Sequence, residues 1–271
     1  MLTPEIKDKD AAPACLYLAT LYQQLRQEGK TLLDYYIHIL EELGGYADIN
    51  RSIMMVGAEG VLCRDRVMQS LRDRPPHKLG GYTITKMVDY WDEDSFGPFV
   101  SETDKLPRNV LQVFTEACVV IIRPSGTEPK LKFYCQLLPQ EGDASLRGRE
   151  LLDEVRTKAE TVAGKVYNDL LAYLDCHLSE ASLLLPDIID LERKQYFDQH
   201  MVPQFRQALF SGNFINLNQA LSWLREESAA MVPGADPLPA LKVPFTALCK
   251  QWSPEGAMSP VLTELTQWAQ E

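Results

Sequence analysis

Residues 119–138 constrain the fold of this chain more strongly than any other stretch. They open with an apolar, β-branched run that ends at Arg123, and they close with a run in which apolar and polar residues alternate from Leu131 to Leu137. A period of two is typical of a half-buried strand. The sequence therefore predicts two strands joined by a short loop, which Pro124 and Pro129 stiffen at its ends.

The residues of this loop combine the groups that bind a phosphate. The guanidinium of Arg123 can hold a phosphate with two parallel hydrogen bonds. The hydroxyls of Ser125 and Thr127 are further donors, and Gly126 lets backbone N–H groups approach an oxygen. Lys130 adds positive charge. We therefore predict that these five residues bind phosphate, with Arg123 as the bidentate clamp.

The charge distribution favours a small anion as the ligand. Three basic residues stand against one acidic residue within residues 119–138, whereas the whole chain has a net charge of −11. A small positive region on an acidic protein suits a small anion better than a polyanion. We therefore expect neither nucleic acid nor an anionic membrane as a main partner. The alternative interpretation is a polar hairpin loop whose charges are merely solvated.

The composition is that of a globular protein of the cytoplasm. No apolar run reaches the roughly 18 residues expected of a membrane-spanning helix, and the N-terminus has no apolar signal-peptide core. Six cysteines are scattered without paired Cys-x-x-Cys spacing, so we expect reduced thiols and no zinc site. These features predict a cytoplasmic location.

The loop also resembles that of a known family. The unbroken Arg-Pro-Ser-Gly-Thr-Glu-Pro-Lys at residues 123–130, followed by Leu-Lys-Phe-Tyr, resembles the phosphate-binding loop in the last domain of the α-D-phosphohexomutases. The Asp-Lys-Asp at residues 8–10 and the Gly-Lys-Thr-Leu-Leu-Asp at residues 29–34 resemble the last helices of the third domain of these enzymes, and they are most similar to the phosphoglucomutase and phosphopentomutase branch. That branch usually has Gly where this chain has Ala11.

The resemblance implies an isomerase of carbohydrate metabolism, a phosphotransferase of the phosphoglucomutase or phosphomannomutase type. Such an enzyme moves a phosphoryl group between two positions of a hexose or pentose phosphate. The loop at residues 123–130 would hold the phosphate that does not react. This chain would then be the C-terminal phosphate-binding portion of a phosphohexomutase.

Three elements of the family are missing from this sequence: the phosphoserine motif, the metal loop and the sugar-selecting loop. We therefore assign no catalytic and no metal-binding residue, and we expect Mg²⁺ only in a full-length enzyme. The chain alone is expected to be inactive. Its partners would be the phosphosugar and the missing N-terminal mutase domains. The alternative is a free-standing phosphosugar-binding or interaction module with a helical, partner-binding tail.

The expected fold class is α+β, with a small, mostly antiparallel sheet and helices on one face. A helical hairpin precedes this sheet, with a capping box at Thr31 and Asp34, and an all-helical extension follows it. We expect residues 91–108 to be an irregular loop, and the proline-rich segment after residue 231 to separate two helices of the extension. The predicted domains are residues 1–48 (terminal helices of the third mutase domain), 49–176 (the phosphate-binding domain) and 177–271 (the helical extension).

Overall fold

The computed structural model describes residues 11–139, 145–253 and 260–271. Contacts divide the chain into two compact units, of which the first comprises Met1–Asp48 with Gln136–Ala159 and the second Ile49–Cys135 with Glu160–Glu271. The predicted resemblance at residues 8–10 lies outside the described residues. The domain boundaries predicted from the sequence stay predictions.

The first unit contains the predicted helical hairpin, α1 (Ala11–Gln27) and α2 (Leu32–Leu43). The capping box is confirmed, because Thr31 Oγ1 accepts from the N–H of Asp34 at 3.1 Å and Asp34 Oδ2 accepts from the N–H of Thr31 at 2.8 Å. These hydrogen bonds hold the pKa of Asp34 below its usual value. Gly29, with a φ of 72°, turns the chain between the two helices.

The sheet has six strands in the order β1-β6-β5-β4-β3-β2. The pairs β2–β3, β3–β4 and β4–β5 are antiparallel, so the predicted α+β class is confirmed. The strand bounds are β1 Ala47–Met54, β2 Lys78–Leu79, β3 Tyr82–Asp89, β4 Leu111–Thr115, β5 Cys118–Pro124 and β6 Lys130–Leu137.

The two strands on either side of the loop that follows Arg123, β5 and β6, bury alternate residues, as the sequence pattern predicts. In β6 the buried positions include Leu131, Phe133 and Leu137. The turn between β4 and β5 has weak turn chemistry in the sequence, but Thr115 stabilises it. Its hydroxyl accepts from the N–H of Ala117 at 3.2 Å and of Cys118 at 2.9 Å.

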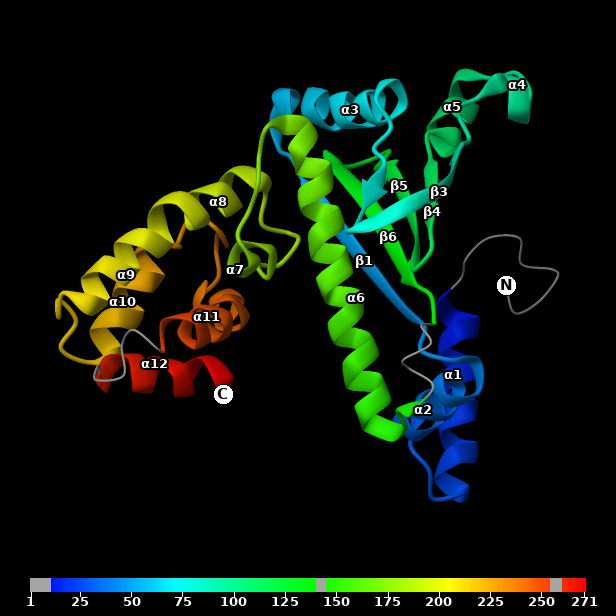
Figure 1. Cartoon of the computed structure of the whole chain (residues 1–271). Coiled ribbons are helices and arrows are strands. Elements are labelled where there is room, and N and C mark those ends of the chain that lie inside the picture. The colour runs from blue at the N-terminus through cyan, green and yellow to red at the C-terminus, as the bar shows by residue number, and fades with distance from the viewer. Residues whose placement is uncertain (1–10, 140–144, 254–259) are drawn as a thin grey trace. The chain divides into compact units, whose positions relative to one another are not determined.

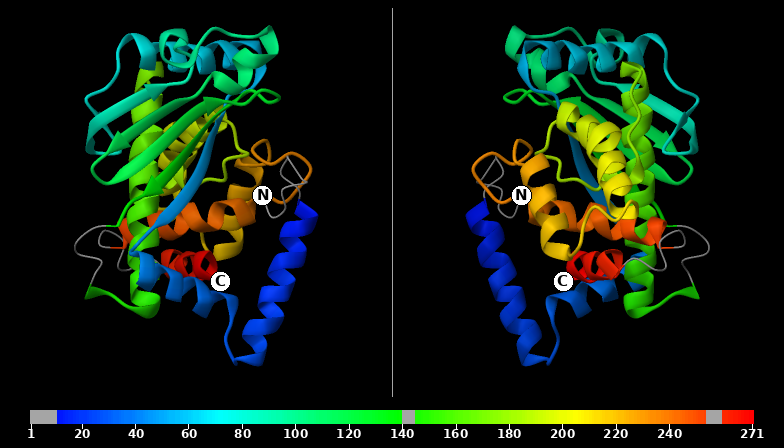
Figure 2. Two further views of the ribbon diagram at one scale, coloured as in Figure 1. Left: turned by 90° about the vertical axis from the view of Figure 1, so that its right-hand side faces the viewer. Right: turned by 90° about the vertical axis from the view of Figure 1, so that its left-hand side faces the viewer.

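Helix α3 (Gly57–Asp73) contacts β5, and the part of α6 (Gly148–Leu171) from residue 160 onward lies along one face of the sheet in Figures 1 and 2. Tyr167 of α6 packs edge-to-face against Phe133, with ring centroids 6.0 Å apart. Gly80, with a φ of 63°, approaches α6 so closely that a Cβ would lie 3.0 Å from Val162 and Val166. Only glycine therefore fits this position without strain.

The expectation of an irregular loop over residues 91–108 is wrong, because this segment contains two short helices. These are α4 (Glu93–Phe96) and α5 (Glu102–Arg108). Local capping explains them, since Asp92 accepts from the N–H of Asp94 at 3.0 Å and Ser101 from that of Asp104 at 3.3 Å.

The C-terminal extension folds around an aromatic core. The ring of Phe205 lies 5.1 Å from Phe245 and 5.5 Å from Trp223, and Phe245 lies 6.2 Å from Trp252. The elements are the 3-10 helix η2 Ala172–Leu174, α7 Glu180–Leu183, α8 Leu191–Tyr196, the π-helix η3 Phe197–Met201, α9 Val202–Phe210, α10 Leu217–Glu227, α11 Leu238–Trp252 and α12 Pro260–Gln270.

The proline-rich segment is not the break that the sequence indicates. Helix α11 begins at Leu238, continues through Pro239 and contains Pro244. Pro239 is tolerated because it lies in the first turn, where the missing N–H would have no helical partner. Pro244 is buried among the apolar residues of the extension, and this packing offsets the hydrogen bond that it removes from the helix.

Candidate phosphate-binding site

A cleft of about 360 Å³ lies where β5 ends, and three segments distant in the sequence form it. Helix α3 contributes one side, the end of α5 another, and the β5–β6 loop a third. Of the five predicted phosphate-binding residues, three lie in its lining. The cleft is lined by Arg64, Asp65, Leu106, Pro107, Asn109, Arg123, Pro124, Ser125 and Gly126.

Arg123 is the residue best placed to bind an anion here. It is half-buried near the end of β5, between the buried residues Ile122 and Pro124 that fix the strand. Within the described parts of the chain its guanidinium makes no hydrogen bond and no ion pair with another residue. A guanidinium stays charged and carries five N–H donors, so this one is available to an anion that enters the cleft.

Ser125 is held firmly by the backbone of the loop. Its N–H donates to the carbonyl of Lys130 at 2.9 Å, and the N–H of Met55 donates to the carbonyl of Pro129 at 2.8 Å. Ser125 is only 5% exposed, yet its hydroxyl has no hydrogen-bond partner among the described residues. A positioned hydroxyl beside an unpaired guanidinium is a suitable second donor to an anion.

The tip of the loop is open to solvent. Gly126 and Thr127 are exposed, and neither N–H donates to another residue in the ranges that the structure describes. A Cβ added at Gly126 would meet nothing within 4 Å, so there is space beside the backbone. Thr127 is not part of the cleft lining, although it is next to Gly126 in the chain.

Lys130 is likewise outside the cleft lining. Its ammonium lies 2.8 Å from Glu128 Oε2, and this hydrogen bond lowers the pKa of the Glu128 carboxyl. The positive charge of Lys130 is therefore partly neutralised by a residue of the same loop. An anion in the cleft would compete with Glu128 for this lysine.

Arg64 is a residue of the site that the sequence analysis missed. It lies on α3, where Nη1 donates to the carbonyl of Ser125 at 3.0 Å and Nη2 lies 2.8 Å from Asp65 Oδ1. The guanidinium thus supports the loop from the side, and Asp65, which also lines the cleft, partly neutralises its positive charge. No local pattern could have revealed it, because its partner Ser125 lies 61 residues further along the chain.

Neither a metal-binding cluster nor a membrane-spanning helix is found in residues 11–139, 145–253 and 260–271. In these ranges no group of three or more His, Cys, Asp and Glu side chains could hold a metal ion. None of the helices there is long and apolar enough to cross a membrane.

Comparison with known proteins reveals relatives of one enzyme class. A phosphoglucomutase of Staphylococcus haemolyticus is 34% identical over 139 residues, and one of Staphylococcus aureus is 30% identical over 137 residues; each match covers 49% of this chain and 25% of the relative. A probable phosphomannomutase of Haemophilus influenzae is 31% identical over 156 residues, which is 58% of this chain and 28% of that protein.

About half of this chain is similar in sequence to these phosphoglucomutases and to the probable phosphomannomutase. The predicted resemblance is therefore confirmed, although no family model matches the chain. The matched region spans only 25–28% of the length of these relatives.

Proposed function

We propose that this chain is the C-terminal phosphate-binding portion of a phosphohexomutase. The loop at residues 123–130 would hold the non-reacting phosphate of a hexose or pentose phosphate while another part of the enzyme transfers the second phosphoryl group. The observation that carries the proposal is the guanidinium of Arg123, which lines a cleft without a protein partner among the described residues. The relatives, named as phosphoglucomutases and a probable phosphomannomutase, support the same reading.

Binding of the phosphate that does not react would contribute to catalysis by positioning the rest of the substrate. Binding energy from a part of the substrate that does not react can orient the hydroxyl that does. Correct placement of reacting groups is worth roughly 7–11 kcal/mol over a whole active site. A loop that recognises phosphate and little else would also accept the sugar in both orientations that a mutase requires.

The remaining mutase domains are the proposed partner, and the helical hairpin offers a surface for them. Helix α1 buries only Leu25 and α2 only Leu40, whereas Leu16 is 71% exposed and Leu43 64% exposed. Exposed apolar surface of this extent is typical of an interaction site. Further large apolar residues exposed on the hairpin are Tyr17, Leu18, Tyr22, Leu32, Tyr35 and Tyr36.

The catalytic serine and Mg²⁺ would come from those other domains. The described residues offer no carboxylate cluster that fits the ion, so no step is assigned to it here. It follows that the purified 271-residue chain should show no mutase activity by itself. Turnover by this chain alone would contradict that part of the proposal.

Phosphate binding can be tested directly on the purified chain. Inorganic phosphate and glucose 1-phosphate are titrated while backbone ¹H–¹⁵N spectra are recorded, and the loop at residues 123–130 should shift. Arg123→Ala should abolish the shifts. Arg66→Ala removes an exposed arginine of α3 outside the cleft lining and should bind like the unaltered chain. If the loop does not respond, or if both variants lose binding equally, the proposal is wrong.

The same titration tests the alternative that the chain is a free-standing phosphosugar-binding or interaction module. A cleft of about 1110 Å³ between α7, α9 and α11 favours this alternative, because it gives the tail a possible partner site. An isolated mutase portion should bind weakly, with a Kd in the range of about 1 mM, since most sugar contacts are missing. A Kd near 1 μM, about a thousandfold tighter, would instead favour the module.

A further inference from the structure

Asn109 lies in the phosphate cleft although it is outside the loop that carries the family motif. It follows α5 directly and precedes β4, and it is one of the residues that line the cleft together with Arg123. Its backbone N–H donates to the carbonyl of Leu106 at 3.3 Å, which fixes the chain at the end of the helix. The cleft therefore has an amide side chain on the side that α5 forms.

The orientation of this amide follows from its neighbour Arg72. Nη2 of Arg72 donates to Oδ1 of Asn109 at 2.8 Å. Because a guanidinium can only donate, the oxygen of the amide must face Arg72 and the NH₂ group must point away from it. The assignment of the two amide ends is thus determined by chemistry.

Arg72 is itself held in a fixed position. Its Nε and Nη2 atoms donate to the two carboxylate oxygens of Asp89 at 2.8 and 3.2 Å, and its guanidinium lies 5.4 Å from the ring centre of Trp91. A bidentate pair with a stacked aromatic ring leaves a guanidinium little freedom. Arg72 therefore orients Asn109 before any ligand arrives.

The NH₂ group of Asn109 makes no hydrogen bond to the residues that the structure describes. It is also not one of the buried polar atoms that lack a partner. Two N–H donors are consequently accessible to solvent at the cleft. The same cleft lining contains Arg123 and Ser125, whose side chains make no hydrogen bond to the described residues.

We propose that Asn109 is a further phosphate-binding residue, which donates from Nδ2 to an oxygen of the bound phosphate opposite Arg123. Arg72 is the positioning residue that presents this donor. The inference rests on the proposed function of the cleft. It adds a ligand contact from the α5–β4 turn, which the loop motif does not contain.

The first test leaves the protein unaltered. Inorganic phosphate is titrated into the ¹⁵N-labelled chain, and the side-chain NH₂ resonances of Asn109 are assigned by comparison with Asn109→Ala. These resonances should shift with the same Kd as the backbone of Gly126. If the loop shifts and the Asn109 side chain does not, the inference is wrong while the proposed function stands.

The second test makes the same amide-to-carboxylate change at two positions, one inside and one outside the cleft lining. Asn109→Asp keeps an oxygen for Arg72 but replaces the donors with a negative group, so phosphate affinity should fall at least tenfold. Asn109→Ala should weaken it several-fold. Gln112→Glu makes the same amide-to-acid change at a residue of β4 outside the cleft lining, and it should bind normally. Arg72→Lys should weaken phosphate binding less than Asn109→Asp does. It should also shift the side-chain NH₂ resonances of Asn109 in the ligand-free protein.

The outcomes separate the two proposals. Loss of affinity in both Asn109 variants, but not in Gln112→Glu, supports the inference. Normal affinity in the Asn109 variants together with loss in Arg123→Ala overturns it and leaves the proposed function intact. Absence of phosphate binding by the unaltered chain overturns both.

Discussion

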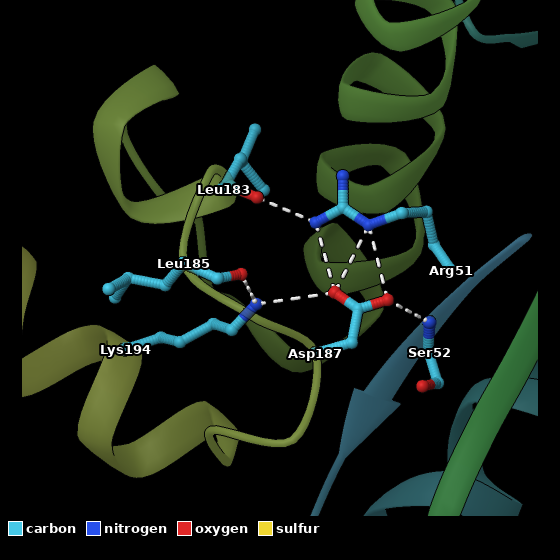
Figure 3. Close-up of polar contacts among 6 residues, drawn as sticks. All are labelled: Arg51, Ser52, Leu183, Leu185, Asp187 and Lys194. Atoms are coloured by element: carbon cyan, nitrogen blue, oxygen red, sulfur yellow. Dashed lines mark hydrogen bonds and ion pairs between the residues drawn. The ribbon is translucent and has the colours of Figure 1, made fainter. Parts of the chain in front are cut away.

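Both carboxylate oxygens of Asp187 share the single N–H of Arg51 Nε, at 3.1 and 3.2 Å, across 136 residues of sequence (Figure 3). The same carboxylate accepts from the N–H of Ser52 at 2.6 Å and lies 3.5 Å from Nζ of Lys194. This cluster joins strand β1 to the segment between α7 and α8 within the second unit. The helical extension is therefore attached to the sheet by a largely buried network of charges.

Removal of Asp187 should destabilise the protein substantially. In Asp187→Ala the guanidinium of Arg51, 13% exposed, and the buried ammonium of Lys194 would lose their shared counter-ion. Breaking a buried ion pair by removing one partner typically costs about 3–5 kcal/mol. The free energy of unfolding in urea measures the effect.

The exposed pair between Arg225 and Asp236, at 3.1 Å, provides the control. Asp236→Ala should cost much less than Asp187→Ala, because solvent screens both groups. Equal effects of the two substitutions would show that the cluster at Asp187 contributes no more than a surface pair.

Lys194 should make the stability depend on pH. Burial lowers the pKa of this lysine to about 8, although the nearby Asp187 acts in the opposite direction. The unfolded chain, with a lysine pKa near its usual value, binds more protons between pH 8 and about 10.5, so the free energy of unfolding rises with pH in that window. Burial raises the pKa of Tyr167, so this tyrosine opposes the trend only above about pH 10.

The experiment compares unfolding in urea at pH 7.5 and pH 9.5. We expect a gain of about 2 kcal/mol from Lys194 over this interval. Lys194→Met removes the titrating group and retains an apolar chain of similar length, so its gain should be smaller by that amount. A parallel pH dependence of both proteins would contradict the prediction.

Gly126→Ala should separate ligand binding from folding. The added Cβ would meet no atom within 4 Å and φ is not positive, so stability should change by less than about 0.5 kcal/mol. The methyl group would nevertheless stand beside the N–H groups offered to phosphate, and affinity should fall several-fold. Thermal melting and the phosphate titration measure the two effects. Unchanged affinity would show that the backbone N–H groups beside Gly126 do not contact the phosphate.

Glu128→Gln should strengthen phosphate binding. Without its carboxylate partner at 2.8 Å, Lys130 would be free to approach an anion, and one negative charge would leave the loop. We expect a gain of a few-fold that decreases with added salt. Glu28→Gln disrupts a more exposed pair, in which Glu28 lies 2.9 Å from Lys30, and it should leave the affinity unchanged. A loss of affinity in Glu128→Gln would indicate that Glu128 helps to shape the loop.

The sequence alone determined the parts of this protein that depend on neighbouring residues. Alternation in residues 131–137 identified β6, and Thr31 with Asp34 identified the start of α2, because both patterns arise from contacts a few residues apart. The resemblance to the phosphohexomutases was also recognisable from eight consecutive residues, 123–130. Local capping at Asp92 and Ser101 was available in the sequence as well, but the prolines and glycine nearby concealed it.

Only the tertiary structure decided which distant groups meet. Folding brings Arg64 to the carbonyl of Ser125, 61 residues further along the chain. It also joins Arg51 to Asp187, which lie 136 residues apart. The fold also brings Arg72 to the amide oxygen of Asn109, a residue that lines the same cleft as Arg123. Such contacts leave no periodic pattern in the sequence, because they depend on how the elements pack and on where each charged or polar group finds a partner once water is excluded.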